Sequence, residues 1–494
     1  MGLKSGENNA AYDYDGIIVQ IVDYVYTFEP TSSAAWSRAK VALLDALGCA
    51  IESFHSSAEC RHLVGPTLGS PRWLPDGVTL PGTAYRLDLL KGAFGVGSMI
   101  RYLDHNDAYP GAEWGHPSDN LGAIITAAEV ISRSTGKPIL MKTVLQGLIK
   151  AYEIQGCFQI KNAFNRIGLD HVILVKVAST AVVSWMLGLE KEQALSAVSH
   201  AWVDGHPLRV YRQAPNTGPR KGWAAGDACL RAVQLALAAR SGQPGMKTAL
   251  TAPKWGFYDA LFKSASFELP RPFGSWVMEN VLFKVNTAEG HGMTAIEAAL
   301  EISEALRNSN RKPEDIASIA VRTQEAGMII INKAGPLHNA ADRDHCLRYM
   351  VAVVFFKGSQ IDTEDYQNAS PWARDPRVAA LREKIAMAED AQFTADYHDP
   401  DVRSVTNALC VEMSDGAQFE ALVEYPLGHV RRRETTEEVY KKARRNMALR
   451  LPKQQVGRIL ETVQGGAFGE MPASEFMDMY AIEEMEGWND RNGH

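Results

Sequence analysis

The chain has 494 residues, of which 46% are hydrophobic, and this is enough for a large core or for two domains. The net charge is −7 and no basic block occurs, so we expect no nucleic-acid partner. The most apolar run, residues 173–189, contains Lys176 and is too short to span a bilayer, so we expect no membrane partner either.

The first half of the chain has a helical pattern. Val41, Leu44 and Leu47 recur at helical spacing within residues 36–54. Further helices are predicted at residues 89–103, 121–134, 139–155, 173–187, 191–202 and 228–240, and Gly242 ends the last of them. We therefore expect a mainly α fold with a large all-helical domain over residues 1–276.

The pattern changes near residue 277. Residues 281–283 and 316–323 are predicted strands, and residues 409–413 and 419–425 flank Asp415-Gly416, a strong hairpin signal. Helices are predicted between the strands, at residues 293–306, 344–356 and 378–387. This order predicts a smaller α+β lid domain over residues 277–430. Helices at 434–448 and 453–463 are expected to return to the helical domain, within residues 431–494.

Polar residues gather in a loop before the predicted helix at residue 121. Asp104 and His105 are followed by His116 and Asp119, in a segment rich in Gly and Pro. Titratable groups packed at the start of a buried helix are typical of active sites. The simpler interpretation is a polar loop in which Asp119 or Asn120 caps the helix.

Two more clusters lie in the helical half. His171 precedes a buried helix, whose dipole disfavours a charged imidazole there, so His171 is a candidate neutral base or donor. The loop that follows carries Arg209, Arg212 and Lys221, and it is a candidate site for the carboxylates of a small polyanion. The alternatives are a histidine that bonds to local backbone, and a loop that is solvated or contacts a partner subunit.

Lys284 and His291 lie where the predicted α+β domain begins. His291 stands between two glycines, which permit close approach of a ligand, although a plain strand-to-helix turn is the alternative. Asp344 is a cap candidate, so the neighbouring His345 is interpreted mainly as a helix start. Since no histidine pair has HxxxH or HxH spacing, we expect neither a metal nor another cofactor.

Long blocks of the chain resemble the MmgE/PrpD family, over roughly residues 15–485. They include Gly115-His116-Pro117-Ser118-Asp119-Asn120 and Gly168-Leu169-Asp170-His171-Val172. Further blocks are residues 175–181, 214–218, 221–227, 250–253, 277–284 and 341–346. Blocks of this length are more specific than any short motif.

The resemblance implies a homodimer of subunits with a helical domain and an α+β lid. It also implies metal-independent elimination of water from 2-methylcitrate to give 2-methyl-cis-aconitate, in the methylcitrate route of propionyl-CoA disposal. The catalytic positions that it implies are Asp104, His116, His171, Lys284, His291 and Tyr349. To these we add Arg209, Arg212 and Lys221 as cations that bind the tricarboxylate substrate.

Elimination next to a carboxylate requires a placed base and cations for the developing charge. One of His116, His171 and His291 is expected to take the proton, and which one stays open at this stage. The segment 286–290 before His291 is less bulky than in bacterial dehydratases, which favours a larger pocket. An alkylcitrate dehydratase of fungal secondary metabolism, a cis-aconitate decarboxylase and a non-catalytic helical binding protein therefore stay open.

The cysteines and the N-terminal residues bear on location. Six cysteines form no CxxC pair, which predicts free thiols in a reducing compartment. Residues 1–7 have neither an apolar run nor an Arg-rich pattern. We therefore expect the protein in the cytoplasm rather than in the mitochondrion.

Overall fold

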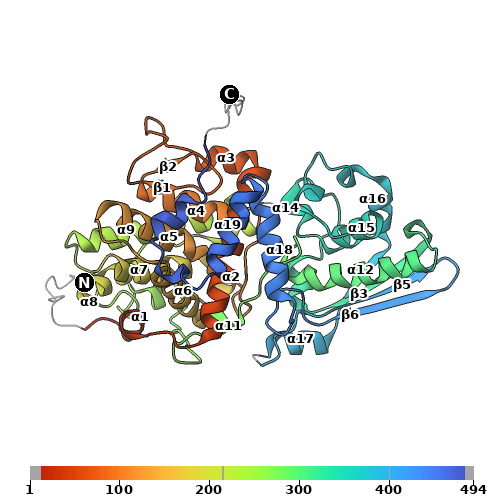
Figure 1. Ribbon diagram of the computed structural model, residues 1–494. Coiled ribbons are helices and arrows are strands. Elements are labelled where there is room, and N and C mark those ends of the chain that lie inside the picture. Colours follow the sequence, from red (N-terminus) through yellow and green to blue (C-terminus); the bar gives the residue numbers. More distant parts are fainter. Residues whose placement is uncertain (1–12, 214–215, 400, 484–494) are drawn as a thin grey trace.

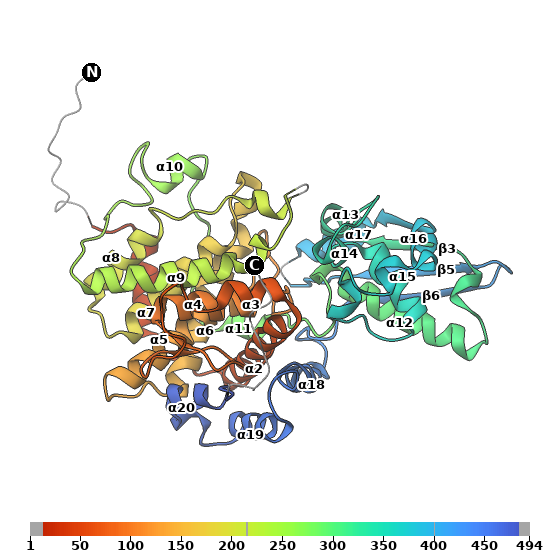
Figure 2. The same ribbon diagram turned by 90° about the horizontal axis from the view of Figure 1, so that it is seen from above.

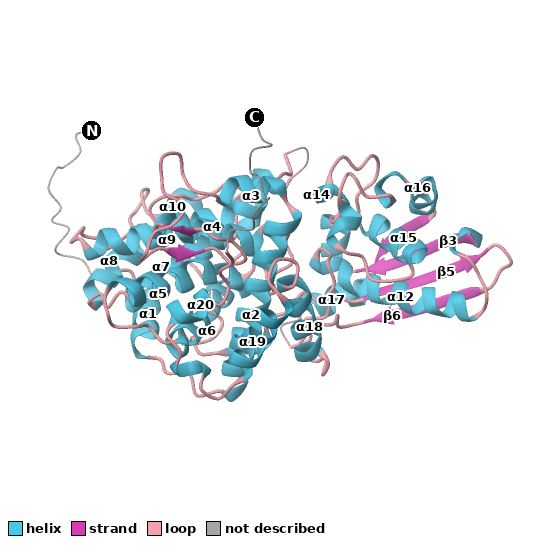
Figure 3. Ribbon diagram, turned by 45° about the horizontal axis from the view of Figure 1, so that its top comes forward, coloured by secondary structure: helices cyan, strands magenta, loops and turns pink. Residues whose placement is uncertain are grey.

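A computed structural model describes residues 13–213, 216–399 and 401–483. Residues 1–7, on which the expected location depends, lie outside this part of the chain. The fold is mainly α, as predicted, and its strands form one small sheet and a two-stranded ribbon (Figure 3). Across the described ranges, no helix has the length and the apolar character needed to cross a membrane.

The helical body occupies the N-terminal half of the chain. Its helices are α1 (Gly16–Thr27), α2 (Ser33–Ser56), α3 (Ala58–Val64), α4 (Leu89–Arg101), α5 (Leu121–Ser134), α6 (Met141–Lys161), α7 (Val172–Met186), α8 (Lys191–Ala201), α9 (Arg220–Arg240), α10 (Phe257–Leu261) and α11 (Trp276–Asn280). A short ribbon pairs β1 (Val78–Thr79) with β2 (Arg86–Leu87). The predicted helices are confirmed, but α9 begins at Arg220 rather than at residue 228. Helices α4 and α9 approach so closely that a Cβ on Gly226 would lie 2.1 Å from the Ser98 hydroxyl. Glycine at this position is therefore what permits the close packing.

A sheet unit, which we define as residues 288–423, follows. Its strands are β3 (Ile316–Thr323), β4 (Ile385–Glu389), β5 (Asn407–Met413) and β6 (Gln418–Val423), in the order β4-β3-β5-β6. Strand β3 is parallel to β4 and antiparallel to β5, and β5 is antiparallel to β6. Its helices are α12 (Met293–Asn308), α13 (Glu325–Ile330), α14 (Ala340–Arg343), α15 (Leu347–Lys357), α16 (Pro376–Glu383) and α17 (Ala391–His398). Helix α12 packs on β5 and β6, and the predicted hairpin is confirmed.

Two predicted elements are wrong. Residues 281–283 form no strand of a sheet, because Leu282 makes only an isolated bridge with Ala108. The predicted helix over 378–387 ends at Glu383, and the chain continues as strand β4. Tertiary pairing with β3 overrides the helix-forming Ala, Met and Glu residues of β4.

The last three helices lie against the helical body. Helix α18 (Thr435–Met447) packs on α2, and α20 (Ala473–Asp478) packs on α5 and α6 (Figures 1 and 2). With α19 (Lys453–Gln464), they contribute apolar side chains to the core cluster of the first helices. The sheet unit has a core cluster of its own. The exact domain boundaries given above stay predictions.

Candidate active site

A cavity of about 290 Å³ lies between the helical body and the sheet unit. This volume is near the lower end of the range for small-molecule sites. The helical body lines it with Arg101, Asp104, Trp114, His116, His171, Arg209, Arg212, Gln213, Thr217 and Lys221. The sheet unit lines it with Glu289, His291, Ile329, Ile330, Asn332, Lys333 and His345. Five of these side chains are cations and two are carboxylates, so the cavity suits a small anion with several charges.

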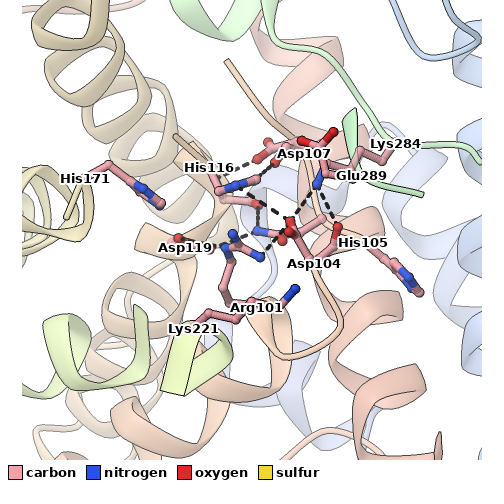
Figure 4. Close-up of polar contacts among 12 residues, drawn as sticks. Arg101, Asp104, His105, Asp107, His116, Asp119, His171, Lys221, Lys284 and Glu289 are labelled. Atoms are coloured by element: carbon pink, nitrogen blue, oxygen red, sulfur yellow. Dashed lines mark hydrogen bonds and ion pairs between the residues drawn. The ribbon is translucent and has the colours of Figure 1, made fainter. Parts of the chain in front are cut away.

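Asp104 lies at the centre of the charged cluster, just after α4 (Figure 4). Its Oδ1 lies 2.7 Å from Arg101 Nη1 and 2.6 Å from Lys284 Nζ. Burial acts to raise the pKa of Asp104, but the Arg101 and Lys284 charges outweigh it and hold that pKa well below the ordinary value. Asp104 is therefore ionised at neutral pH.

His116 precedes the short helix η2 (Pro117–Asn120), which leads into α5. Its Nδ1 lies 2.7 Å from the Asp107 carbonyl oxygen, so Nδ1–H donates and the other nitrogen, Nε2, is left with a lone pair. Nε2 lies 3.7 Å from Asp104 Oδ1. Burial, followed by the Arg101 and Lys284 charges, lowers the pKa of His116 well below its usual value. The imidazole is neutral and can accept a proton.

His171 precedes α7 and faces His116, with ring centroids 5.5 Å apart. It is 2% exposed, and neither ring nitrogen has a hydrogen-bond partner. Burial lowers the pKa of His171 well below its usual value; Asp170, whose Oδ1 lies 3.5 Å from Nδ1, opposes this, and Arg212 adds to it. Buried polar atoms that lack a hydrogen bond are rare in proteins, so Nε2 in particular is available to a bound ligand.

Two arginines of the predicted anion loop already have carboxylate partners. Arg212 forks onto Asp170, through Nε to Oδ2 and through Nη2 to Oδ1 at 3.2 Å. Arg209 Nη1 donates to Glu113 Oε1 at 3.3 Å. Both arginines line the cavity, as predicted, but each has only part of its guanidinium free. Residues 214 and 215 of the same loop lie outside the described part of the chain.

Lys221, in the first turn of α9, is more available to a substrate than Arg209 and Arg212 are. It is 6% exposed, and its Nζ has no hydrogen-bond partner, although Asp344 Oδ2 lies 3.5 Å away. Asp344 also pairs with His345 Nδ1. The predicted cap role of Asp344 is wrong, because Cys346 precedes α15 and Asp344 instead forms an ion pair with Lys221 of the helical body.

His291 has an oriented imidazole on the opposite wall, within η5 (Gly290–Gly292). Its Nδ1 lies 2.9 Å from Glu289 Oε1, and its Nε2 lies 3.1 Å from the Tyr397 hydroxyl. Burial opposes ionisation of Glu289, but His291 outweighs it and lowers the pKa of Glu289 to about 2. Trp114 packs against His291 in a tilted arrangement, with ring centroids 4.4 Å apart, and a Cβ on Gly290 would lie 2.8 Å from that indole.

Two of the expected catalytic residues do not line the cavity. Lys284 is buried behind Asp104, where Nζ donates to both the carboxylate and the carbonyl oxygen of that residue. The Tyr349 hydroxyl donates to the Asp365 carbonyl oxygen at 2.7 Å. Both side chains thus have internal partners in this structure.

Sequence reasoning missed several lining residues. Arg101 ends α4 and looked like an ordinary C-terminal cation, and Glu289 looked like part of a turn. The Glu289-Gly290-His291 spacing was the available signal, because a carboxylate two positions before a histidine can reach its Nδ1. Lys333 was missed because nothing in its local pattern sets it apart from an ordinary surface lysine. Tyr397, which does not line the cavity but contacts His291, had no local signal because it lies 106 positions away from that histidine. Within residues 13–213, 216–399 and 401–483, no group of three or more His, Cys, Asp or Glu side chains is arranged to hold a metal ion.

Comparison with known proteins gives two family matches. The MmgE/PrpD N-terminal domain matches residues 19–270, and the MmgE/PrpD C-terminal domain matches residues 287–465. Together they cover most of the chain. The gap between them contains Lys284 and the buried segment before it.

Similar proteins extend over almost the full chain. The 2-methylcitrate dehydratase-like protein oryR of Aspergillus oryzae is 63% identical, over 97% of this chain and 98% of its own length. The 2-methylcitrate dehydratase of Escherichia coli O157:H7 is 51% identical, over 96% and 99%. The alkylcitrate dehydratase phiI of a fungal species is 46% identical, over 96% and 95%.

Proposed function

This chain belongs to the MmgE/PrpD family, and on that premise we propose that it is a hydro-lyase for 2-methylcitrate or a related 2-alkylcitrate. The product is 2-methyl-cis-aconitate or its alkyl homologue, and the released proton and hydroxide leave as water. The names of the similar proteins support a citrate-type dehydratase. The observation that carries the proposal is a cavity with five cations and two buried, neutral histidines beside an ionised Asp104.

We assign the base to His116. Its Nε2 carries the lone pair, and Asp104 stabilises the imidazolium that forms when Nε2 takes the proton from the carbon next to a carboxylate. The cations on the helical wall stabilise the charge that develops on that carboxylate. His171, with its unpaired ring nitrogens, is proposed to hold the substrate against His116 by a hydrogen bond.

We assign the departure of hydroxide to His291. Nδ1–H donates a hydrogen bond to Glu289, so in the protonated ring Nε2–H is the group that gives its proton to the departing hydroxide, which leaves as water. Tyr397 orients that nitrogen by a hydrogen bond. Base and acid thus come from opposite walls, which suits removal of a proton and a hydroxide from two adjacent carbons. Lys284 and Tyr349, which have internal partners, are proposed to support Asp104 and the sheet unit rather than to touch substrate.

Metal independence is part of the proposal. The cations that line the cavity support this proposal. Arg101, Lys221 and the other cationic side chains repel a metal ion and attract the carboxylates of the substrate. The sheet unit is proposed to act as a lid, since its histidine completes the site. Homodimer formation also stays a proposal.

The location of the protein stays a prediction. Six free cysteines fit a reducing compartment. A relative from Yarrowia lipolytica, 47% identical over 96% of this chain and 91% of its own, carries "mitochondrial" in its name. Cell fractionation decides between cytoplasm and mitochondrion.

The second candidate substrate is a 2-alkylcitrate with an alkyl group longer than methyl. The position of Ile329 favours this candidate. This side chain on α13 lines the cavity and is 75% exposed. An exposed isoleucine at the mouth of a charged cavity offers an apolar surface for an alkyl chain that leaves the carboxylate site.

The decisive experiment is a substrate series. Purified protein is incubated with citrate, 2-methylcitrate and 2-hexylcitrate, and the enoate product is followed by its ultraviolet absorbance. We expect turnover of at least one 2-alkylcitrate, without release of CO₂. Release of CO₂ from cis-aconitate would instead identify a decarboxylase, and absence of any turnover would support a non-catalytic binding protein.

A further inference from the structure

Glu52 is a buried carboxylate outside the cavity that joins three separate parts of the chain. It lies in α2 and is 5% exposed. Its Oε1 is 3.1 Å from His105 Nδ1 and accepts from the Thr363 hydroxyl at 2.5 Å. Its Oε2 accepts from Asn446 Nδ2 at 2.8 Å. The donors come from the loop after α4, from the sheet unit and from α18, respectively.

The charge of Glu52 makes these bonds strong. Burial acts to raise its pKa, but His105, Thr363 and Lys442 outweigh burial and lower that pKa to about 2. Glu52 is therefore ionised at neutral pH. Hydrogen bonds to an ionised acceptor are stronger than those between neutral groups.

His105 is held from a second direction. Lys442 Nζ donates to its carbonyl oxygen at 2.6 Å and forms an ion pair with Asp45 at 2.7 Å. Lys442 and Asn446 are four positions apart on α18, so one helix face supplies both contacts. The ring and the backbone of His105 are thus held by α2 and α18 together.

The residue before His105 is Asp104, which has a positive φ of 63°. For a residue with a side chain, such a conformation is unfavourable and persists only where the surroundings hold it. The surroundings here are Lys284, which binds the Asp104 carbonyl oxygen, and the contacts of His105. The position of the Asp104 carboxylate therefore depends on contacts made one residue away.

We propose that Glu52 is a positioning residue that couples the sheet unit to Asp104. The hydrogen bond from Thr363 ties the position of Glu52 to that of the sheet unit. Glu52 in turn fixes the position of the His105 ring, and this fixes the position of Asp104, the preceding residue. The Asp104 carboxylate is then correctly placed only when the sheet unit is docked on the helical body. This inference rests on the proposed function, because it takes Asp104 to be the partner of the base.

The test removes the Thr363 hydroxyl while keeping the size of the side chain. We expect Thr363→Val to lower kcat by about 10-fold, since small displacements of catalytic groups have large effects on rate. KM should stay within about 2-fold, because Thr363 does not line the cavity. Thr363→Ser, which retains the donor, should restore kcat.

Thr180→Val is the matched control. Thr180 is also buried, and its hydroxyl donates to the Lys176 carbonyl within α7. The two valine variants should have similar melting temperatures, but only Thr363→Val should lose kcat. Equal kcat values in the two variants would overturn the proposal, and so would a loss of kcat in Thr363→Ser equal to that in Thr363→Val.

Hydrogen exchange gives a readout that does not need activity. In Thr363→Val, the amides of residues 104–108 should exchange faster than in the wild-type protein, and unchanged exchange there would contradict the coupling. If Thr363→Val does not fold, Thr363→Ala removes the same donor without placing a second methyl group against the carboxylate. A wild-type protein that dehydrates no 2-alkylcitrate would refute the proposed function, and hydrogen exchange would still test the coupling.

Discussion

The cations around the cavity differ in how much of each is free for substrate. Arg212 holds Asp170, which is fully buried, whereas Lys221 Nζ has no hydrogen-bond partner. A sequence pattern cannot separate the two cases, because both are cations of the same loop region. The difference arises from Asp170, which the fold brings to Arg212.

This difference predicts opposite effects of two similar substitutions. Lys221→Met should raise KM by roughly 10- to 100-fold, since a bond to a charged group contributes about 1.5–3 kcal/mol. It should cost less stability than Arg212→Met, because Asp344 keeps His345 as a second partner. Arg212→Met should lower the free energy of unfolding by about 3–5 kcal/mol, because it leaves the Asp170 charge buried without a partner. Steady-state kinetics and denaturant unfolding measure the two effects. A stable Arg212→Met variant with only a raised KM would contradict this ranking.

Asp119 gives the stability a pH dependence. Burial raises its pKa to about 7, although Arg101 opposes this. Between about pH 4 and 7 the folded state holds a proton that the unfolded chain has released, so stability falls as pH rises through this range. In Asp119→Asn this fall should be smaller, by up to a few kcal/mol. Denaturant unfolding at pH 5 and pH 8 measures how far the free energy of unfolding falls in each protein. Asp23→Asn, on the exposed side of α1, is the control. An identical slope in Asp119→Asn and the wild-type protein would contradict the assignment.

At the scale of elements, the predictions succeeded where periodicity and side-chain burial agree. Helix α5 and strand β3 have the predicted bounds, because α5 is an apolar helix whose residues 121–129 are all buried and β3 has one side that faces a core. Strand β4 was missed because its residues favour a helix and only its pairing with β3 makes it extended. Tyr397 was missed for a related reason, because it is 106 positions from His291 and meets it only in the fold.

Helix α13 is predicted to select the alkyl chain. Ile329→Ser should lower kcat/KM for 2-hexylcitrate by roughly 10-fold while changing that for 2-methylcitrate little, because about 0.8 kcal/mol is lost for each methylene that is no longer buried. Leu422→Ser is the control, since Leu422 is 54% exposed on β6 and does not line the cavity. A parallel loss with both substrates would indicate that the alkyl group lies elsewhere.

For the molecule as a whole, the sequence predicted a helical part, a part with strands and the residues that meet between them. It did not predict how those residues pair, because Lys221 and Asp344 are far apart along the chain and meet only where the helical body contacts the sheet unit. The chemistry of the site depends on such long-range pairs.

The whole enzyme is predicted to work without a metal. Dialysis against EDTA should leave kcat and KM unchanged, because the five cations that line the cavity disfavour binding of a metal ion there. Activity before and after dialysis, with metal content measured on the same sample, checks this. Loss of activity that zinc, iron or magnesium restores would refute the prediction.

The return of α18 to α2 has a consequence for biosynthesis. Gly48 of α2 is fitted to α18 so closely that a Cβ there would lie 3.3 Å from Ala443 Cα. The ribosome must first make the sheet unit, which at about 5–20 residues per second takes on the order of ten seconds. During that time the apolar face of α2 that will receive Val439 and Met447 lacks its cover. The nascent chain is then most open to aggregation, and a chaperone that binds apolar segments would protect it until translation ends.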